Sequence, residues 1–244
     1  MPYEIKLLDL LDVNVESSFL VLARNMGTIT TVKTWGMLIL GGDDPILVDT
    51  GASSPEIMQR VGMTAVSTEE MSLASQLARH DVKLSDIRYV LHTHHHIDRL
   101  HTPGALRLLD LELSGPDEIL PGIVCEAAGG HTEGSMNILV ETAEGTACIC
   151  GDVIYDLQNQ VVEPWHQVLD FEPQSTGNQG TSKREERAAI KKALNSGTFV
   201  LPLHDYPARV ACGRVVSRLA DSVPGPETPV EHRSVAQTHE AVHV

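Results

Sequence analysis

The sequence predicts an α+β fold, an αββα sandwich in which two mixed β-sheets stack on each other and are flanked by helices. Hydrophobic residues make up 42% of the 244 residues and charged residues 21%, a composition typical of a globular chain. Short apolar runs of strand length recur along most of the sequence. Their order divides the chain into two halves, each with strands followed by a helix, which favours stacked sheets with outer helices.

The first half begins with strand signals that extend from residue 3 to about residue 49. We expect strands at the apolar runs 19–22, 37–40 and 46–48, the last two joined by a Gly-Gly-Asp-Asp-Pro turn, which favours an antiparallel meander. Residues 68–79 place apolar side chains at helical spacing after Glu69 and Glu70, and this pattern predicts a helix. A β-type run at 87–91 then ends directly in a cluster of histidines.

The second half repeats the order of strands and then a helix. We expect a helix at 184–194 and strands at 122–125, 138–140, 147–150 and 199–203. Residues 209–220 are compatible with either a short helix or a strand. Prolines and scattered charges from residue 222 predict a loosely ordered tail over 222–244, after a single domain that spans 1–221.

Composition and charge argue against several classes of partner. The net charge of −15 disfavours binding to nucleic acid or to anionic membrane surfaces, and an aromatic content of 4% weakens any base-stacking role. The chain has neither an apolar run of roughly 20 residues nor a signal-peptide core, so we expect a cytoplasmic protein. Cys148 and Cys150 alternate within an apolar strand, and we expect reduced core thiols on one face.

Histidines are concentrated directly after the predicted strand at 87–91. Four of the chain's twelve histidines lie within residues 92–96. In an extended segment His94 and His96 share a face, which Asp98 continues, whereas His92 points away from it. Two neutral imidazoles and a third nitrogen suit a metal such as Zn²⁺ with an open position for water.

Further donor groups follow later apolar strands. His131 lies in a Gly-Gly-His-Thr segment, Asp152 follows a strand where its carboxylate could bridge two metals, and His204 follows another strand end. Asp49 also ends a strand, and we expect it to act as a structural hydrogen-bond acceptor beside the metal rather than as a ligand. Asp205 follows His204 directly, and it either orients that ligand or is exposed to solvent.

On these motifs the chain resembles the metallo-β-lactamase-fold hydrolase superfamily and, within it, the N-acyl homoserine lactonases. The family pattern is His-x-His-x-Asp-His, then Gly-His-Thr, Gly-Asp and a final His, with an upstream Asp-Thr-Gly that matches residues 49–51. The resemblance runs from about residue 35 to 206 and implies a metallo-β-lactamase-like hydrolase domain over 1–221. It implies one or two zinc ions, with Mn, Co or Fe as alternatives. The first would be bound by His94, His96 and His131, and the second by Asp98, Asp152 and His204.

The resemblance also implies an activity. A metal-bound hydroxide would open the ring of an N-acyl homoserine lactone, a quorum-quenching reaction, or hydrolyse another small-molecule ester. Tyr155, in an Asp-x-x-Tyr segment, would hydrogen-bond the carbonyl oxygen and the developing oxyanion, and Asp98 would relay a proton to the leaving alkoxide. Two alternatives stay open: a glyoxalase II-type thioesterase, and a catalytically impaired paralogue that binds a metabolite or a partner. The sequence leaves the oligomeric state open, and a homodimer is the commonest arrangement.

One position departs from the family pattern. Arg99 stands where the family has a histidine, and a guanidinium that stays protonated cannot bind a metal. The interval between Asp98 and His131 is also shorter than is usual for the family. Three explanations stay open: a natural deletion, a stretch left out of the sequence, or replacement of the missing donor by His101. We favour lost or omitted sequence.

Overall fold

The computed structural model describes residues 2–21, 24–52, 54–94, 107–108, 116–164, 182–219, 222–223 and 227–229. Strands followed by a helix occur in both halves of the chain, as the sequence predicts. The elements up to the histidine cluster are β1 (Glu4–Glu16), α1 (Ser17–Leu20), β2 (Ile29–Leu40), β3 (Ile46–Val48), η1 (Pro55–Val61), β4 (Thr64–Val66), η2 (Glu69–Met71), α2 (Leu73–Ala78), η3 (Leu84–Asp86) and β5 (Tyr89–Leu91).

The second group of elements begins with β6 and is mostly β-structure. It comprises β6 (Arg107–Leu108), β7 (Asp117–Leu120), β8 (Ile123–Ala127), β9 (Met136–Thr142), β10 (Gly145–Gly151), η4 (Gln158–Val162), α4 (Lys183–Asn195), β11 (Phe199–Pro202), β12 (Ala208–Ala211), β13 (Arg214–Leu219), β14 (Ser222–Val223) and β15 (Glu227–Pro229). None of the helices in the described ranges is long and apolar enough to span a membrane.

Two mixed sheets form the body of the molecule. One has the strand order β14-β1-β2-β3-β5-β6 with β4 beside β1, and the other has the order β15-β13-β12-β11-β10-β9-β8-β7. The first sheet contains a meander of β1, β2 and β3, and its pairs β3–β5 and β5–β6 are parallel. The second sheet has one parallel pair, β10–β11, within an otherwise antiparallel order.

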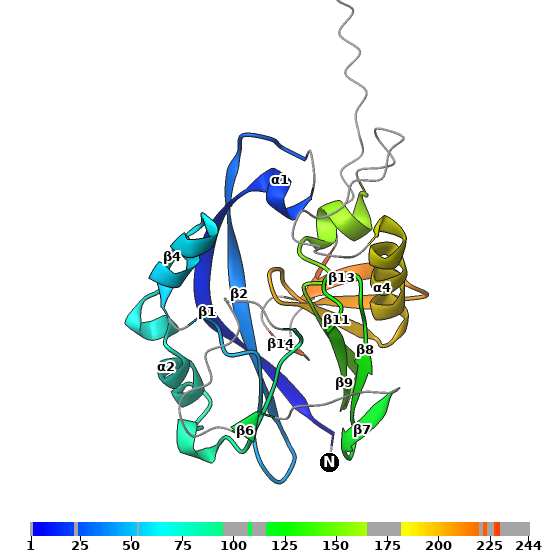
Figure 1. The fold of residues 1–244 in the computed structure, drawn as a ribbon. Helices are drawn as coiled ribbons and strands as arrows, with labels where there is room; N and C mark the ends of the chain where they lie inside the picture. The colour runs from blue at the N-terminus through cyan, green and yellow to red at the C-terminus, as the bar shows by residue number, and fades with distance from the viewer. Residues whose placement is uncertain are drawn as a thin grey trace, which may run out of the picture.

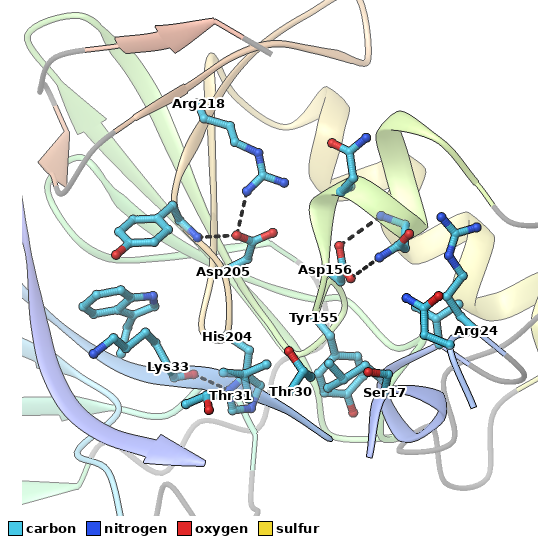
Figure 2. Close-up of a pocket in the computed structure, with 18 residues that line it drawn as sticks. Ser17, Arg24, Thr30, Thr31, Lys33, Tyr155, Asp156, His204, Asp205 and Arg218 are labelled. Atoms are coloured by element: carbon cyan, nitrogen blue, oxygen red, sulfur yellow. Dashed lines mark hydrogen bonds and ion pairs between the residues drawn. The ribbon is translucent and has the colours of Figure 1, made fainter. Parts of the chain in front are cut away.

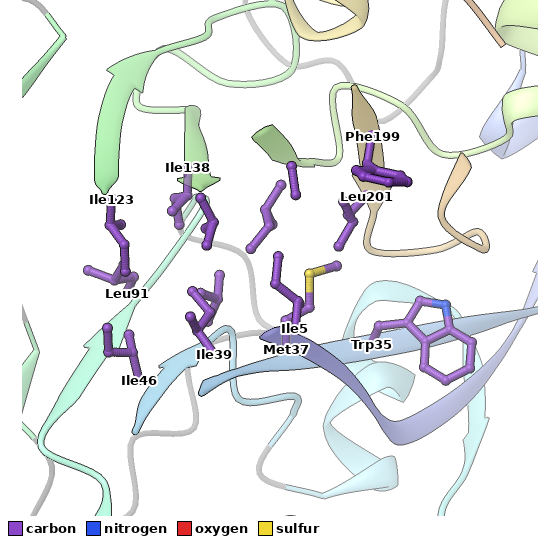
Figure 3. Packing of buried hydrophobic residues seen from close by; sticks show 14 of the residues in the cluster. Ile5, Trp35, Met37, Ile39, Ile46, Leu91, Ile123, Ile138, Phe199 and Leu201 are labelled. Atoms are coloured by element: carbon purple, nitrogen blue, oxygen red, sulfur yellow. The ribbon is translucent and has the colours of Figure 1, made fainter. Parts of the chain in front are cut away.

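The main hydrophobic core lies between the two sheets. Side chains such as Ile5, Met37 and Ile39 from the first sheet face Ile138 and Phe199 from the second (Figure 3), and all five are fully buried. Burying such a side chain contributes about 1.5–3 kcal/mol, so this apolar layer is what holds the two sheets together.

Helices cover the outer faces of both sheets, which completes the αββα sandwich that the sequence predicts. Leu77 of α2 packs with Leu38 and Leu47 on the outside of the first sheet, and Ala189 and Ala193 of α4 pack on the outside of the second. Figure 1 shows α2 and α4 on opposite sides of the paired sheets. Cys148 and Cys150 are buried together in the core under α4 as free thiols, which confirms their expected role.

Most of the predicted elements are present, and three differ. The run 19–22 was expected to be a strand, but this prediction is wrong, because the Glu16 carboxylate accepts a hydrogen bond from the Ser18 amide and starts the short helix α1. The predicted helix at 68–79 is divided into η2 and α2 by the extended backbone of Ser72, whose hydroxyl caps α2. Of the range 209–220, the described residues 209–219 form two strands, since Cys212 and Gly213 both have positive φ and close a tight hairpin.

The described residues of the predicted tail form two short strands. β14 pairs with β1 and β15 pairs with β13, both within the range 222–244 that the sequence predicts to be loosely ordered. The rest of that range lies outside the described residues.

Candidate metal centre

The carboxyl ends of parallel strands bring the candidate ligands to one edge of the fold. β3 and β5 run parallel, so Asp49 after β3 lies beside the segment from His92 to His94 after β5. β10 and β11 also run parallel, so Asp152 and His204 emerge together from the other sheet.

His131 is held by a separate turn between β8 and β9. The Thr132 amide donates to the Ser135 hydroxyl at 3.0 Å, which closes the turn, and the Met136 amide donates to the Thr93 carbonyl at 2.8 Å. The second hydrogen bond ties this turn to the segment that carries His94. The two sheets therefore meet at the site through backbone contacts as well as through their core.

Three imidazoles converge on one carboxylate oxygen. The Oδ2 atom of Asp152 lies 3.4 Å from His94 Nε2, 3.7 Å from His131 Nε2 and 3.6 Å from His204 Nε2. Within the described part of the chain, His94, His131 and Asp152 form a group whose ligand atoms all lie within 4.8 Å of one another. None of these four side chains is more than 9% exposed.

This geometry and donor set fit a divalent metal ion. Two donors bound tetrahedrally to one Zn²⁺ at about 2.0–2.1 Å lie about 3.3–3.4 Å from each other. The separations from Asp152 to His94 and His131 are close to that value. Imidazole nitrogen and carboxylate oxygen are ordinary ligands for zinc and for neighbouring transition metals. The same oxygen also lies 3.6 Å from His204 Nε2, and this third contact suits the expected role of Asp152 as a carboxylate between two ions.

A relay of hydrogen bonds fixes the tautomer of His94. The Thr93 hydroxyl donates to Asp49 Oδ2 at 2.9 Å, because an ionised carboxylate can only accept. The same hydroxyl lies 3.1 Å from His94 Nδ1, so the imidazole donates there and its Nε2 carries the lone pair. Asp49 also accepts from the Thr93 amide at 3.1 Å, which places it as a structural acceptor behind the ligand.

His204 is oriented in a comparable way by a backbone carbonyl. Its Nδ1 donates to the Lys33 carbonyl of β2 at 2.6 Å (Figure 2). This leaves Nε2 directed at Asp152. Trp35, also on β2, donates its amide hydrogen to the Leu203 carbonyl at 2.9 Å. The strand β2 therefore holds the residue before His204 as well. Outer hydrogen bonds of this kind are the usual support of a metal-binding histidine.

Tyr155 contacts two of the candidate ligands. Its hydroxyl lies 2.9 Å from His131 Nδ1, and its ring stacks on that of His204 with centroids 5.8 Å apart and planes at 17°. The structure therefore gives Tyr155 a supporting contact with His131 that the sequence pattern did not indicate. Its expected contact with a substrate carbonyl stays a prediction.

Some of the predicted site residues are not described. His96, Asp98, Arg99 and His101 lie outside the described residues, so the remaining ligands of both proposed ions stay expectations. His92, expected to point away from the metal, is buried with Nδ1 3.3 Å from Asp49 Oδ1. This contact with Asp49 is compatible with a structural role, and the expected direction of His92 away from the metal stays a prediction.

A cavity of about 390 Å³ opens beside the metal centre. His204 and Tyr155 form one part of its wall, and the segment from α1 to β2 forms another (Figure 2). Among the described residues, most of the lining side chains are polar, including Arg24, Asn25 and Arg218. No sequence pattern indicates this arrangement, since the lining residues come from four distant parts of the chain.

Comparison with known proteins agrees with the fold. The family model described as the metallo-beta-lactamase superfamily matches residues 29–108, while no curated protein is similar enough in sequence to match. A probable metal-dependent hydrolase from Staphylococcus aureus superposes with a TM-score of 0.63 at 17% identity, over 94% of this chain and 97% of its own.

Two lactonases of known structure are also similar. An N-acyl homoserine lactone hydrolase with N-hexanoyl-L-homoserine bound at its catalytic metal centre superposes with a TM-score of 0.58 at 17% identity, over 79% of this chain and 88% of its own. AidC, a dizinc quorum-quenching lactonase, gives 0.59 at 12% identity, over 95% and 96%. The chain therefore has the metallo-β-lactamase fold, and residues 29–108 also carry the sequence pattern of that superfamily. At its strand ends lies a histidine–aspartate group that can hold a metal ion.

Proposed function

We propose that this chain is a metal-dependent hydrolase that opens the ring of an N-acyl homoserine lactone or a closely related ester. The observation that carries the proposal is the convergence of His94, His131 and His204 on one oxygen of Asp152, beside a cavity. We propose zinc as the metal, with Mn, Co or Fe as alternatives, since imidazole and carboxylate donors accept all four.

A divalent ion bound by these donors would supply Lewis acidity toward a carbonyl and a means of activating water near neutral pH. The chain's own residues supply the rest of the chemistry. His94 donates from Nδ1 to the Thr93 hydroxyl, and His204 donates from Nδ1 to the Lys33 carbonyl. Each imidazole therefore keeps a lone pair on Nε2 that can bind the ion without a change of tautomer. Tyr155 lines the cavity next to His204, where its phenol can donate to the oxygen on which negative charge develops. Asp98 keeps its proposed role of carrying a proton to the leaving alkoxide.

The cavity favours a compact, polar substrate. Thr30, Asn25 and Asn159 line it together with charged side chains, whereas a long alkyl chain would gain most from an apolar wall. We therefore expect catalytic efficiency to fall from N-butanoyl to N-decanoyl homoserine lactone. An efficiency that rises steadily with chain length would contradict this reading of the cavity.

The proposal is tested by metal content and by hydrolysis of defined substrates. Protein purified without chelator should contain one or two equivalents of a transition metal and should hydrolyse N-hexanoyl homoserine lactone faster than S-lactoylglutathione. The variant His204→Ala should lose activity by at least tenfold, while the matched control His80→Ala, on the outside of the first sheet, should not. A metal-free protein with no hydrolysis of either substrate after metal addition would refute the proposal.

The same assay resolves the question raised by Arg99. If that residue replaces a ligand of the second ion, Arg99→His should raise the metal content toward two equivalents and increase the rate. An unchanged metal content in this variant would show that position 99 is not part of the site.

A further inference from the structure

Asp205 joins three parts of the chain at the wall of the cavity. Its Oδ2 accepts a hydrogen bond from the Leu157 amide at 2.8 Å, and its Oδ1 accepts from the Tyr206 amide and from Arg218 Nη1, both at 2.7 Å. Figure 2 shows the carboxylate beneath Arg218 and above His204. The side chain is only 15% exposed, so these are enclosed contacts rather than surface ones.

Two of the connected segments carry the candidate ligands. Leu157 lies two residues after Tyr155, in the segment that begins with Asp152 after β10. Asp205 directly follows His204 in the loop after β11. The paired register of β10 and β11 ends at Gly151 and Pro202, so the bond between Leu157 and Asp205 continues the connection beyond the sheet.

The hydrogen bond between Leu157 and Asp205 affects two contacts of the metal centre. The 3.6 Å separation of His204 from Asp152 and the stacking of His204 on Tyr155 both depend on how far apart the two loops lie. Arg218, on β13, adds a charge-assisted hydrogen bond to the same carboxylate. Burial raises the pKa of Asp205, an effect that the Arg218 charge and the bond from Leu157 oppose.

We propose that Asp205, held by Arg218, is a positioning residue that sets the distance between His204 and the segment carrying Asp152 and Tyr155. This inference rests on the metal centre proposed above. It gives Asp205, the residue after His204, a role in metal binding. A purely structural ion pair would not have this role. Removal of a supporting hydrogen bond of this kind typically weakens metal binding by 10–100-fold.

The test compares Asp205→Asn and Arg218→Lys with a control ion pair in the same sheet. Glu144→Gln disrupts the pair between Glu144 and Arg209, which are 2.9 Å apart but remote from the site. Zn²⁺ affinity is measured by competition with a chelating dye, and the absorption spectrum of the Co²⁺ form reports ligand geometry. We expect Asp205→Asn to weaken Zn²⁺ binding at least tenfold and to alter the Co²⁺ spectrum, Arg218→Lys to have a smaller effect, and Glu144→Gln to have none.

A second readout does not depend on the metal. In the metal-free protein, the Leu157 amide and the His204 ring N–H should exchange with solvent faster in Asp205→Asn than in wild type. If wild-type protein binds no metal, the proposed function fails, and this exchange measurement still decides the role of Asp205. Zn²⁺ affinity within twofold of wild type, or unchanged protection of the His204 ring N–H, would overturn the inference even if the variant were less stable.

Discussion

Replacing Gly130 with alanine should disrupt the metal centre through a single steric contact. Gly130 precedes His131 and has φ of +79°, and a Cβ atom built there would lie 2.3 Å from the Cβ of Ala189 on α4. Neighbouring Gly129 has φ of +64°, but a Cβ there would meet nothing within 4 Å. The two glycines therefore share the left-handed backbone and differ in the clash.

The expected magnitudes follow from this difference. A left-handed alanine costs roughly 1–2 kcal/mol, and that is the full expected loss for Gly129→Ala. Overpacking adds about 1–3 kcal/mol, so Gly130→Ala should lose about 2–5 kcal/mol. For a chain of this size each 1 kcal/mol corresponds to about 2–4 °C in Tm. Because the turn cannot move away from α4 without moving His131, Gly130→Ala should also bind Zn²⁺ at least tenfold more weakly.

Thermal unfolding and Zn²⁺ titration of both variants measure these effects. The double variant Gly130→Ala/Ala189→Gly removes the opposing atom and should recover metal affinity, although glycine within α4 costs about 1 kcal/mol of its own. If Gly130→Ala were as stable as Gly129→Ala, or if Ala189→Gly restored nothing, the assignment of His131 to a rigid turn against α4 would be wrong.

Three other predictions follow from contacts around the site. Asp49→Ala should destabilise the fold by about 3 kcal/mol or more and weaken Zn²⁺ binding 10–100-fold, because Thr93 loses two hydrogen bonds to a buried carboxylate. The control Asp44→Ala removes a half-buried carboxylate that pairs with the exposed Arg88, and it should change stability by at most about 1 kcal/mol in a denaturant titration. Brief alkylation of the native protein should modify the exposed Cys212 first, and mass spectrometry measures the labelling. Burial protects the three other cysteines and raises their thiol pKa, to about 11 for Cys125, so early labelling of Cys148 would contradict this prediction. Hydrogen bonds from Ser18 and Gly27 lower the pKa of Glu16, so the stability that they add should be fully present above about pH 4.3 and lost as pH falls through the lowered pKa. The protection factor of the Gly27 amide, which is its exchange rate relative to the intrinsic rate at the same pH, should therefore fall from about pH 6 to about pH 3, and an unchanged protection factor would refute this.

The strand framework could be predicted because burial on both faces leaves a clear signal. β3, β5, β10 and β11 are short runs of apolar residues, and polar groups directly after such runs must lie at a sheet edge. That reasoning predicts Asp49, Asp152 and His204 at strand ends beside one site. The structure brings His204 Nε2 within 3.6 Å of Asp152 Oδ2 and places Asp49 against Thr93. The run 19–22 was misread because an apolar run of that length fits a strand or a buried turn equally well, and only the capping by Glu16 decides between them.

The supporting contacts could not be predicted, because they involve groups that carry no side-chain signature. The acceptor for His204 is the backbone carbonyl of Lys33, 171 positions away in the sequence. The partner of Asp205 is one arginine among several, selected by the pairing of β12 with β13 rather than by its spacing. Residue type and order identify candidate ligands, whereas three-dimensional packing identifies what holds them.

The histidines of the site show that packing contacts, and not residue type alone, decide whether a histidine can bind a metal. His92, His94 and His204 all follow strand ends, and all three engage Nδ1 with an oxygen atom. The imidazoles of His94 and His204 then direct Nε2 at Asp152, whereas that of His92 has its recorded contact with Asp49, behind the site. A histidine next to a strand end is therefore a metal ligand only if its second nitrogen is aimed at a shared centre. This aim is set by Thr93, by the Lys33 carbonyl and, through the loop that carries His204, by Asp205.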